Sequence, residues 1–158
     1  MLELLAPAGN LDAVIAAVQN GADAVYMGFG DGFNARRSAD NFTRESFAKA
    51  VRYCHIRGCK VYVTLNTLVG DREMDAAAAL AQQASDAGAD AILVQDLGLA
   101  RVLRAALPDI PLHASTQMSI HNLAGVEAAA EMGITRAVLA RELSLEQIRF
   151  ISQHASIE

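Results

Sequence analysis

Hydrophobic and polar positions along the chain follow two periods that succeed one another. The segment Leu11–Asn20 has apolar residues every three or four positions, which places them on one face of a helix. The run Val61–Thr64 instead consists of β-branched and aromatic residues, which are typical of a buried strand. The pattern therefore predicts short strands that alternate with helices.

Six strand–helix pairs are predicted in this way. The expected strands are Leu2–Ala6, Asp23–Gly28, Lys60–Leu65, Ala91–Gln95, Pro111–Ala114 and Ala137–Ala140. The expected helices are Leu11–Asn20, a helix capped by Thr43 that runs to Arg57, Asp71–Ala87, Leu97–Leu107, residues 121–132, and Leu145–His154 with Ser144 as its cap. Such alternation predicts a parallel sheet with right-handed crossovers, either doubly wound or closed into a barrel. No Gly-x-Gly-x-x-Gly opens the first helix, which weakens a dinucleotide-binding interpretation.

An internal repeat supports these boundaries. Asn20-Gly-Ala-Asp-Ala-Val, Ala87-Gly-Ala-Asp-Ala-Ile and Met132-Gly-Ile-Thr-Arg-Ala-Val each place a glycine between a helix and the next strand. These turns lie at the side of the sheet opposite the strand ends, so the repeat concerns architecture and not chemistry.

The length of the chain bears on the kind of barrel. A complete eightfold barrel needs about 250 residues, whereas this chain has 158. We therefore expect residues 1–158 to form a single domain, a TIM-like (β/α) barrel with about six βα units that is truncated or incomplete. Residues 156–158 would begin a seventh strand. Open sheet edges would need a cover, for example a second copy in a homo-oligomer.

Composition and charge narrow the possible partners. The formal net charge of -5 argues against nucleic-acid binding by bulk electrostatics and leaves only a local basic site. Apolar runs fall far short of the roughly 20 residues that span a bilayer, and the first residues do not resemble a signal peptide. We expect a cytoplasmic protein without a membrane partner, in which Cys54 and Cys59 are packing thiols.

Candidate site residues follow from the barrel, because the loops after parallel strands share one face. The polar residues at these positions are Asn10, Asn34, Arg36, Arg37, Asn66, Gln95, Asp96, His113, Ser115, Thr116, Gln117, Arg141 and Glu142. Each alone is often a turn or capping residue. Their common position predicts a polar barrel mouth.

Three arginines at this mouth, Arg36, Arg37 and Arg141, would attract a carboxylate or phosphate. The alternative is that they pair with acidic residues of the same loops, namely Asp40, Asp96 and Glu142.

Three residues are the acid–base candidates: Asp96, His113 and Glu142. The alternative for Asp96 and Glu142 is to anchor a helix N-terminus or an arginine. His113 and Ser115 should point the same way from one strand, but an i, i+2 pair seldom gives the geometry of nucleophilic attack. No zinc site is predicted, because His113 and His121 have no suitably spaced carboxylate. Asn66 suits an orienting amide.

Seven segments in order carry a resemblance to a known family: Glu3–Asn10, Gly21–Gly28, Asn34–Arg36, Asn41–Phe42, Val63–Asn66, His113–Gln117 and Val138–Ser144. Together they resemble the N-terminal barrel region of the collagenase-like peptidase family of unknown catalytic type, peptidase family U32. The resemblance covers essentially the whole chain, and the ordered set is far more specific than any one segment.

The resemblance implies a barrel but leaves the reaction open. The family includes enzymes that hydroxylate tRNA uridine or rRNA cytidine, and oxygen-independent hydroxylation proteins of ubiquinone synthesis. In the RNA-modifying members it implies a prephenate-dependent route, and in several members an iron–sulfur cluster held by cysteines that follow this region. Cys54 and Cys59 do not occupy their place, so we expect no cofactor in this chain, although the full-length protein could carry a cluster.

Three hypotheses follow from the resemblance. RNA-base hydroxylation is the more plausible chemistry, with RNA and prephenate as partners through the full-length protein. A genuine peptidase active on collagen-like or other peptides is the second. The third is a substrate-binding module that is inactive when isolated. The expected substrate-binding residues are Asn10, Asn34, Arg36, Asn66, Gln95, Ser115, Gln117 and Arg141. Arg36 and Arg141 would suit a dicarboxylate such as prephenate.

Overall fold

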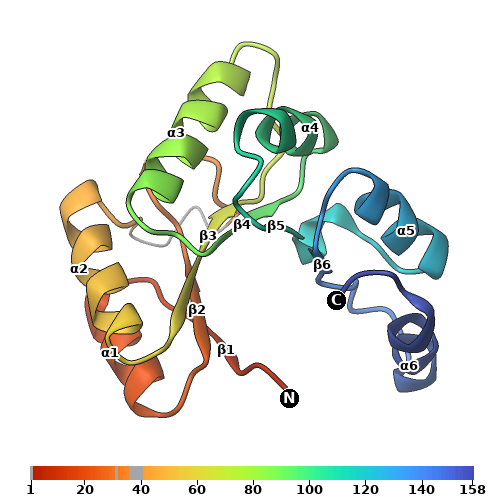
Figure 1. The fold of residues 1–158 in the computed structure, drawn as a ribbon, viewed down its shortest axis with the longest axis horizontal. Helices are drawn as coiled ribbons and strands as arrows, with labels where there is room; N and C mark the ends of the chain where they lie inside the picture. Colours follow the sequence, from red (N-terminus) through yellow and green to blue (C-terminus); the bar gives the residue numbers. More distant parts are fainter. Residues whose placement is uncertain (1, 31, 36–40) are drawn as a thin grey trace.

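The computed structural model describes residues 2–30, 32–35 and 41–158. Within these residues the chain forms one sheet of six parallel strands in sequential order. The strands are β1 (Leu5–Pro7), β2 (Ala24–Met27), β3 (Lys60–Leu65), β4 (Ala91–Val94), β5 (Leu112–Ala114) and β6 (Arg136–Ala137). The sheet curls, and β1 and β6 lie at the two ends of its arc (Figure 1).

Helices connect successive strands and lie along the outer side of this arc (Figure 1). They are α1 (Leu11–Gln19), α2 (Arg44–His55), α3 (Met74–Asp86), α4 (Leu97–Ala106), α5 (Leu123–Glu131) and α6 (Leu145–His154), with a short 3₁₀ helix η1 (Thr116–Met118) after β5. This arrangement confirms the expected TIM-like barrel of six βα units, open between β1 and β6. No helix in the described part of the chain is long and apolar enough to cross a membrane.

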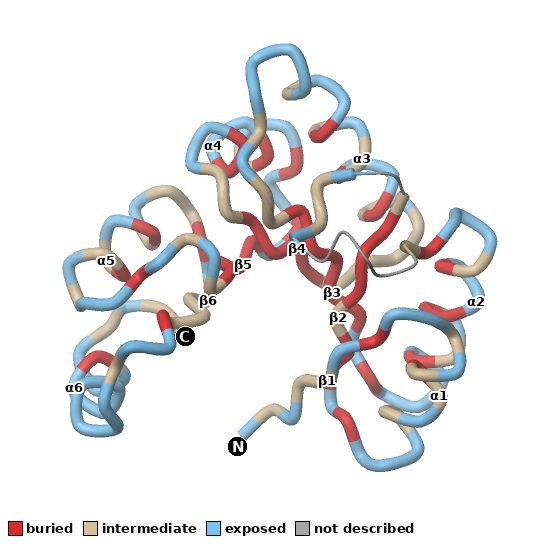
Figure 2. The backbone as a smooth tube through the Cα atoms, turned by 180° about the vertical axis from the view of Figure 1, so that it is seen from behind, coloured by how far each residue is buried: buried red, intermediate tan, exposed pale blue. Residues whose placement is uncertain are grey.

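The inner strands β2 to β5 are the most buried part of the molecule, whereas the end strands β1 and β6 are partly exposed (Figure 2). Along β3 the side chains alternate, so Val61 and Val63 face one way and Tyr62 the other. The two valines pack in the core between the sheet and the helices. Tyr62 packs in a smaller cluster with Ala24 and Leu93. Both faces of the sheet are therefore covered, as expected for parallel strands.

The internal repeat is architectural, as expected. The three glycines that end helices all have positive φ, at 89° for Gly21, 97° for Gly88 and 80° for Gly133. Asp23 and Asp90, which follow Gly21 and Gly88 by two residues, each accept a hydrogen bond from the backbone of a neighbouring segment. Asp23 accepts a 2.7 Å hydrogen bond from the backbone N–H of Leu4, and Asp90 accepts one of 2.7 Å from Val61. The repeat thus fixes strands at their amino ends.

The first strand differs from its expected form. It begins at Leu5, and Leu2 and Leu4 are 97% and 56% exposed, so the expectation of a buried strand from Leu2 was wrong for these residues. The reason is its place at the end of the sheet, where it pairs only with β2. A single neighbour leaves one side of the segment without cover.

The sixth strand begins one residue earlier and ends three residues sooner than expected. Val138 still donates a 2.9 Å backbone hydrogen bond to Ala114, but β5 ends there and the chain turns into η1. Ala140 donates instead to the carbonyl of Ile120 at 2.8 Å. The predicted residues 138–140 thus lack a continuing partner strand.

Glu158 is hydrogen bonded to this region as a parallel strand would be. Its N–H donates to the carbonyl of Thr135 at 3.3 Å, and its carbonyl accepts from the N–H of Ala137 at 2.6 Å. This agrees with the expectation that residues 156–158 begin a seventh strand.

Candidate functional site

A cavity of about 200 Å³ opens at the carboxyl ends of the strands, inside the curl of the sheet. Six of the expected polar residues line it: Asn34, Asn66, Ser115, Thr116, Gln117 and Arg141. They come from the segments after β2, β3, β5 and β6. The structure therefore gathers residues that are more than 100 positions apart in the chain at one mouth.

Asn66 connects two sides of this cavity. Its side-chain oxygen accepts a 3.0 Å hydrogen bond from the backbone N–H of Ala35, and its Nδ2 donates to Ser115 Oγ at 3.2 Å. The backbone N–H can only donate, which fixes the orientation of the amide. Asn66 thus holds the segment after β2 and the end of β5 at a defined separation.

Ser115 is buried and caps η1. Its Oγ accepts a second hydrogen bond, at 3.3 Å, from the backbone N–H of Gln117. A hydroxyl oxygen has two lone pairs, and in Ser115 both face a donor. No described residue accepts its hydroxyl hydrogen, so no base in the described part of the chain activates the oxygen as a nucleophile.

His113 lies deeper than Ser115 on the same face of β5. Its ring meets the ring of Tyr62 edge-on, with 4.9 Å between centroids. Burial, together with the nearby charge of Arg136, lowers the pKa of His113 to about 4. The two side chains share a direction, as expected, but they do not form a Ser–His pair, because two residues along a strand separate them by about 7 Å.

Two other expected site residues cap helices. Asn10 accepts a 2.9 Å hydrogen bond from the N–H of Ala13 at the start of α1. Asp96 accepts hydrogen bonds from Leu99 at 2.8 Å, at the start of α4, and from Val69 at 3.4 Å. Neither side chain lines the cavity. The geometry of Asp96 favours the alternative of helix anchoring over acid–base chemistry, and Asn10, predicted to bind substrate, caps α1.

The remaining expected residues have different surroundings. Glu142 is exposed and lines a neighbouring hollow of about 310 Å³ with Gln117 and Arg141. Gln95 is half-buried and lines neither space. Arg36 and Arg37 lie outside the described residues, as does Asp40.

Arg141 is exposed at the cavity rim. In the described part of the chain it has no ion-pair partner, and this includes Asp96 and Glu142, the two described acidic residues considered for it. The described cavity lining includes no acidic side chain. Arg141 is therefore the one charged side chain in the described lining of the cavity.

Several lining residues were missed from the sequence, namely Leu5, Tyr26, Thr64, Leu93 and Val138. The two-residue period of side chains along a strand could have identified some of these residues from the sequence. Side chains two residues apart share a face, so Thr64 precedes Asn66 on the inner side of β3. Its hydroxyl donates to the carbonyl of Met27 at 3.2 Å.

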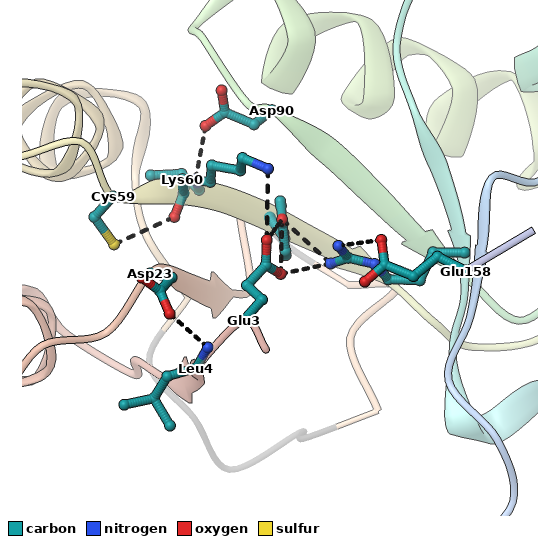
Figure 3. Close-up of polar contacts among 10 residues, drawn as sticks. Glu3, Leu4, Asp23, Cys59, Lys60, Asp90 and Glu158 are labelled. Carbon is teal, nitrogen blue, oxygen red and sulfur yellow. Dashed lines mark hydrogen bonds and ion pairs between the residues drawn. The ribbon is translucent and has the colours of Figure 1, made fainter. Parts of the chain in front are cut away.

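A polar network closes the opposite, amino-terminal end of the curl (Figure 3). The carboxylate of Glu3 accepts hydrogen bonds from the hydroxyl of Tyr62 at 2.9 Å and from Arg136. Lys60 Nζ lies 3.5 Å from Glu3 Oε2. Arg136 also pairs with Glu158 at 2.7 Å. Burial opposes ionisation of Glu3, but the hydrogen bonds from Arg136 and Tyr62 outweigh it and lower its pKa. Burial and the bond to Glu3 raise the pKa of Tyr62 to about 12.

The described residues do not suit a metal or an iron–sulfur cluster. They contain no group of three potential ligands, and the two cysteines are free and buried. Burial raises the pKa of Cys54 to about 12, which disfavours the thiolate that a metal needs. Cys54 lies in the last turn of α2 and Cys59 directly precedes β3, at the amino ends of the strands and away from the mouth.

Comparison with curated proteins finds relatives across nearly the whole chain. It is 43% identical over 152 residues to the "23S rRNA 5-hydroxycytidine C2501 synthase" of Escherichia coli, covering 96% of this chain and 22% of that protein. It is 40% identical over 156 residues to "tRNA hydroxylation protein P1" of Bacillus subtilis, covering 99% and 37%. A "Collagenase" of Porphyromonas gingivalis is 35% identical over 152 residues, covering 96% and 36%. The chain thus spans less than two fifths of the length of these relatives.

The fold also has a solved counterpart. The structure described as that of the U32 peptidase Mk0906 superposes with a TM-score of 0.80 at 17% identity, over 100% of this chain and 67% of that one. At this identity the likeness concerns the fold alone. The sequence profile of peptidase family U32 matches residues 9–158. From this match and the relatives above, the chain belongs to peptidase family U32.

Proposed function

We propose that this chain is the N-terminal barrel region of an enzyme that hydroxylates a base in tRNA or rRNA. The observation that carries the proposal is the identity of 40–43% with two proteins named for RNA hydroxylation. The matched segments include the residues that line the mouth. Because the chain covers only part of each relative, the reaction belongs to the natural protein that contains these residues.

The mouth supplies the binding chemistry for this proposal. Arg141 offers a guanidinium without an acidic partner among the described residues, and no described acidic side chain lines the cavity. A planar guanidinium suits a carboxylate or a phosphate. Prephenate, a dicarboxylate, fits as co-substrate at this mouth, with Gln117 as a neutral hydrogen-bonding neighbour. Arg36 belongs to the same proposal as a second cation.

Partners and location follow from the proposed reaction. This chain would contribute to RNA binding through a local surface, since its own net charge of -5 does not favour extended electrostatic binding. A cytoplasmic location belongs to the same proposal, because it suits RNA substrates. An iron–sulfur cluster, if the natural protein has one, would be held by cysteines outside this chain.

A peptidase is the second candidate, because one relative is named a collagenase. The described mouth favours it less. Ser115 receives two hydrogen bonds and contacts no histidine, and Asp96 is engaged as a helix cap. A binding module without its own activity remains the proposal for the 158 residues in isolation.

A reaction with purified components separates the two activities. The natural protein would be incubated with prephenate and RNA from cells that lack its gene, and digested nucleosides would be analysed by mass spectrometry. We expect hydroxylated cytidine or uridine to form in a prephenate-dependent manner. Cleavage of gelatin or peptides without any hydroxylated nucleoside would overturn the proposal in favour of the peptidase.

A further inference from the structure

The hydroxyl hydrogen of Ser115 has no acceptor among the described residues. A serine hydroxyl has two acceptor lone pairs and one donor hydrogen. Asn66 Nδ2 and the N–H of Gln117 approach the oxygen at 3.2 and 3.3 Å. No described residue accepts the hydroxyl hydrogen. The side chain is only 4% exposed, so this hydrogen has little access to bulk water.

The position of Ser115 indicates where the hydrogen points. The residue lines the cavity, together with Asn66 and Arg141. Because two donors occupy the lone pairs, the O–H bond is directed away from both of them. A buried donor without an acceptor is costly, and the cavity is the space in which an acceptor can be placed.

We propose that Ser115 donates its hydroxyl hydrogen to an oxygen of the ligand in this cavity, and that Asn66 is the positioning residue that directs it. The ligand is a carboxylate, held by Arg141 at the rim and by Ser115 at the buried end. This inference rests on the proposed function for the identity of the ligand, prephenate. It makes Ser115 a determinant of binding and not a nucleophile.

Asn66 acts through its fixed amide. The N–H of Ala35 holds the amide oxygen at 3.0 Å, so the Nδ2 hydrogens must face Ser115. In Asn66→Asp one carboxylate oxygen can still accept from Ala35. The other carboxylate oxygen takes the place of the Nδ2 group that donates to Ser115. Because this oxygen can only accept, the Ser115 hydroxyl turns its hydrogen toward it. The substitution therefore removes the hydrogen from the cavity without removing either side chain.

The test measures prephenate binding to the natural protein by isothermal titration calorimetry. A hydrogen bond to a charged group corresponds to about a 10- to 100-fold change in affinity, so Ser115→Ala should weaken binding by this factor. Asn66→Asp should weaken it at least as much. Ser115→Thr, which keeps the hydroxyl, should stay close to the wild type. Ser152→Ala, on the exposed face of α6, is the matched control and should bind normally.

The outcomes distinguish this inference from the proposed function. Unchanged prephenate affinity in Ser115→Ala overturns the inference even if RNA is hydroxylated. Loss of turnover in that variant with unchanged affinity also overturns it, because it would indicate a chemical role. Weakened prephenate binding in Ser115→Ala without any RNA hydroxylation by the wild type supports the inference and rejects the proposed function. A wild-type protein that does not bind prephenate rejects the inference and prephenate as the co-substrate, whereas RNA hydroxylation is decided separately by the nucleoside analysis.

Discussion

At the scale of single residues, side chains of the same type or on the same strand face have different roles in this barrel. Asn10 and Asn66 both follow strands, but the first caps a helix and the second connects two sides of the cavity. Ser115 and His113 share a strand face, yet one lines the mouth and the other packs below it. Hydrogen-bond partners, and not residue type, decide which of them can meet a ligand.

The buried histidine predicts a dependence of stability on pH. The pKa of His113 is lowered to about 4 from 6.5, mainly by burial. Above pH 6.5 this histidine is neutral in both the folded and the unfolded chain and does not lower the unfolding free energy. As the pH falls toward 4, the unfolded chain binds a proton at this histidine and the folded chain does not, so the unfolding free energy decreases. The loss amounts to at most about 3 kcal/mol. Urea unfolding of the natural protein between pH 4 and 7.5 measures it.

The matched comparison uses two histidine variants. His113→Gln should flatten the pH dependence of the unfolding free energy between pH 4 and 6.5. His154→Gln, at the exposed end of α6, is the control for loss of a histidine elsewhere in the chain. Parallel pH profiles for His113→Gln and the wild type would show that His113 does not titrate as inferred.

At the scale of elements, periodicity and capping residues were enough to predict the six strand–helix pairs. The ends of β1 and β6 were not predictable, because they depend on which strand lies alongside. Site prediction had a similar limit. Position after a strand indicated the mouth, but Asp96 and Ser115 have the same kind of position and both cap a helix. Only the structure shows that Ser115 also lines the cavity and that Asp96 does not. The ion pair between Glu3 and Arg136 joins residues that are 133 positions apart, so no local sequence pattern predicted it.

The segment after β2 depends on close packing at Gly28. A Cβ atom there would lie 2.0 Å from Asn41 Oδ1 and 2.3 Å from Asn34 Nδ2. These two amides form a 3.0 Å hydrogen bond beside the mouth. Gly28→Ala should displace them and lower the unfolding free energy by about 1–3 kcal/mol.

Gly9→Ala is the control for this prediction. Gly9 also follows a strand, and a Cβ there meets nothing within 4 Å. Thermal denaturation of both variants should show a lower midpoint for Gly28→Ala only. Equal midpoints would mean that the segment adjusts without cost.

At the scale of the whole molecule, the curl of the sheet brings together distant parts of the chain at both ends. Glu3, before β1, contacts Arg136 in β6, which in turn holds Glu158. Figure 3 shows Glu3 and Glu158 on the two sides of this network. The network thus links the two ends of the sheet below the cavity and stabilises its curvature.

Removing the charge of Glu3 tests this link. Glu3→Gln leaves the half-buried Arg136 with Glu158 as its acidic partner, and should lower the unfolding free energy by about 1–3 kcal/mol. Glu45→Gln removes an exposed i, i+4 pair with Lys49 and should leave the unfolding free energy almost unchanged, because water screens such a pair. Chemical denaturation of both variants provides the comparison. An equal effect of the two substitutions would argue against a closing role for Glu3.

Nucleoside analysis after gene deletion is the decisive experiment for RNA hydroxylation by the natural protein. Ribosomal RNA and tRNA from the deletion strain and its parent would be digested and compared by mass spectrometry. We expect one hydroxylated cytidine or uridine to disappear and to return when the wild-type gene is restored. Unchanged amounts of hydroxylated cytidine and uridine in the deletion strain would show that the protein does not hydroxylate RNA.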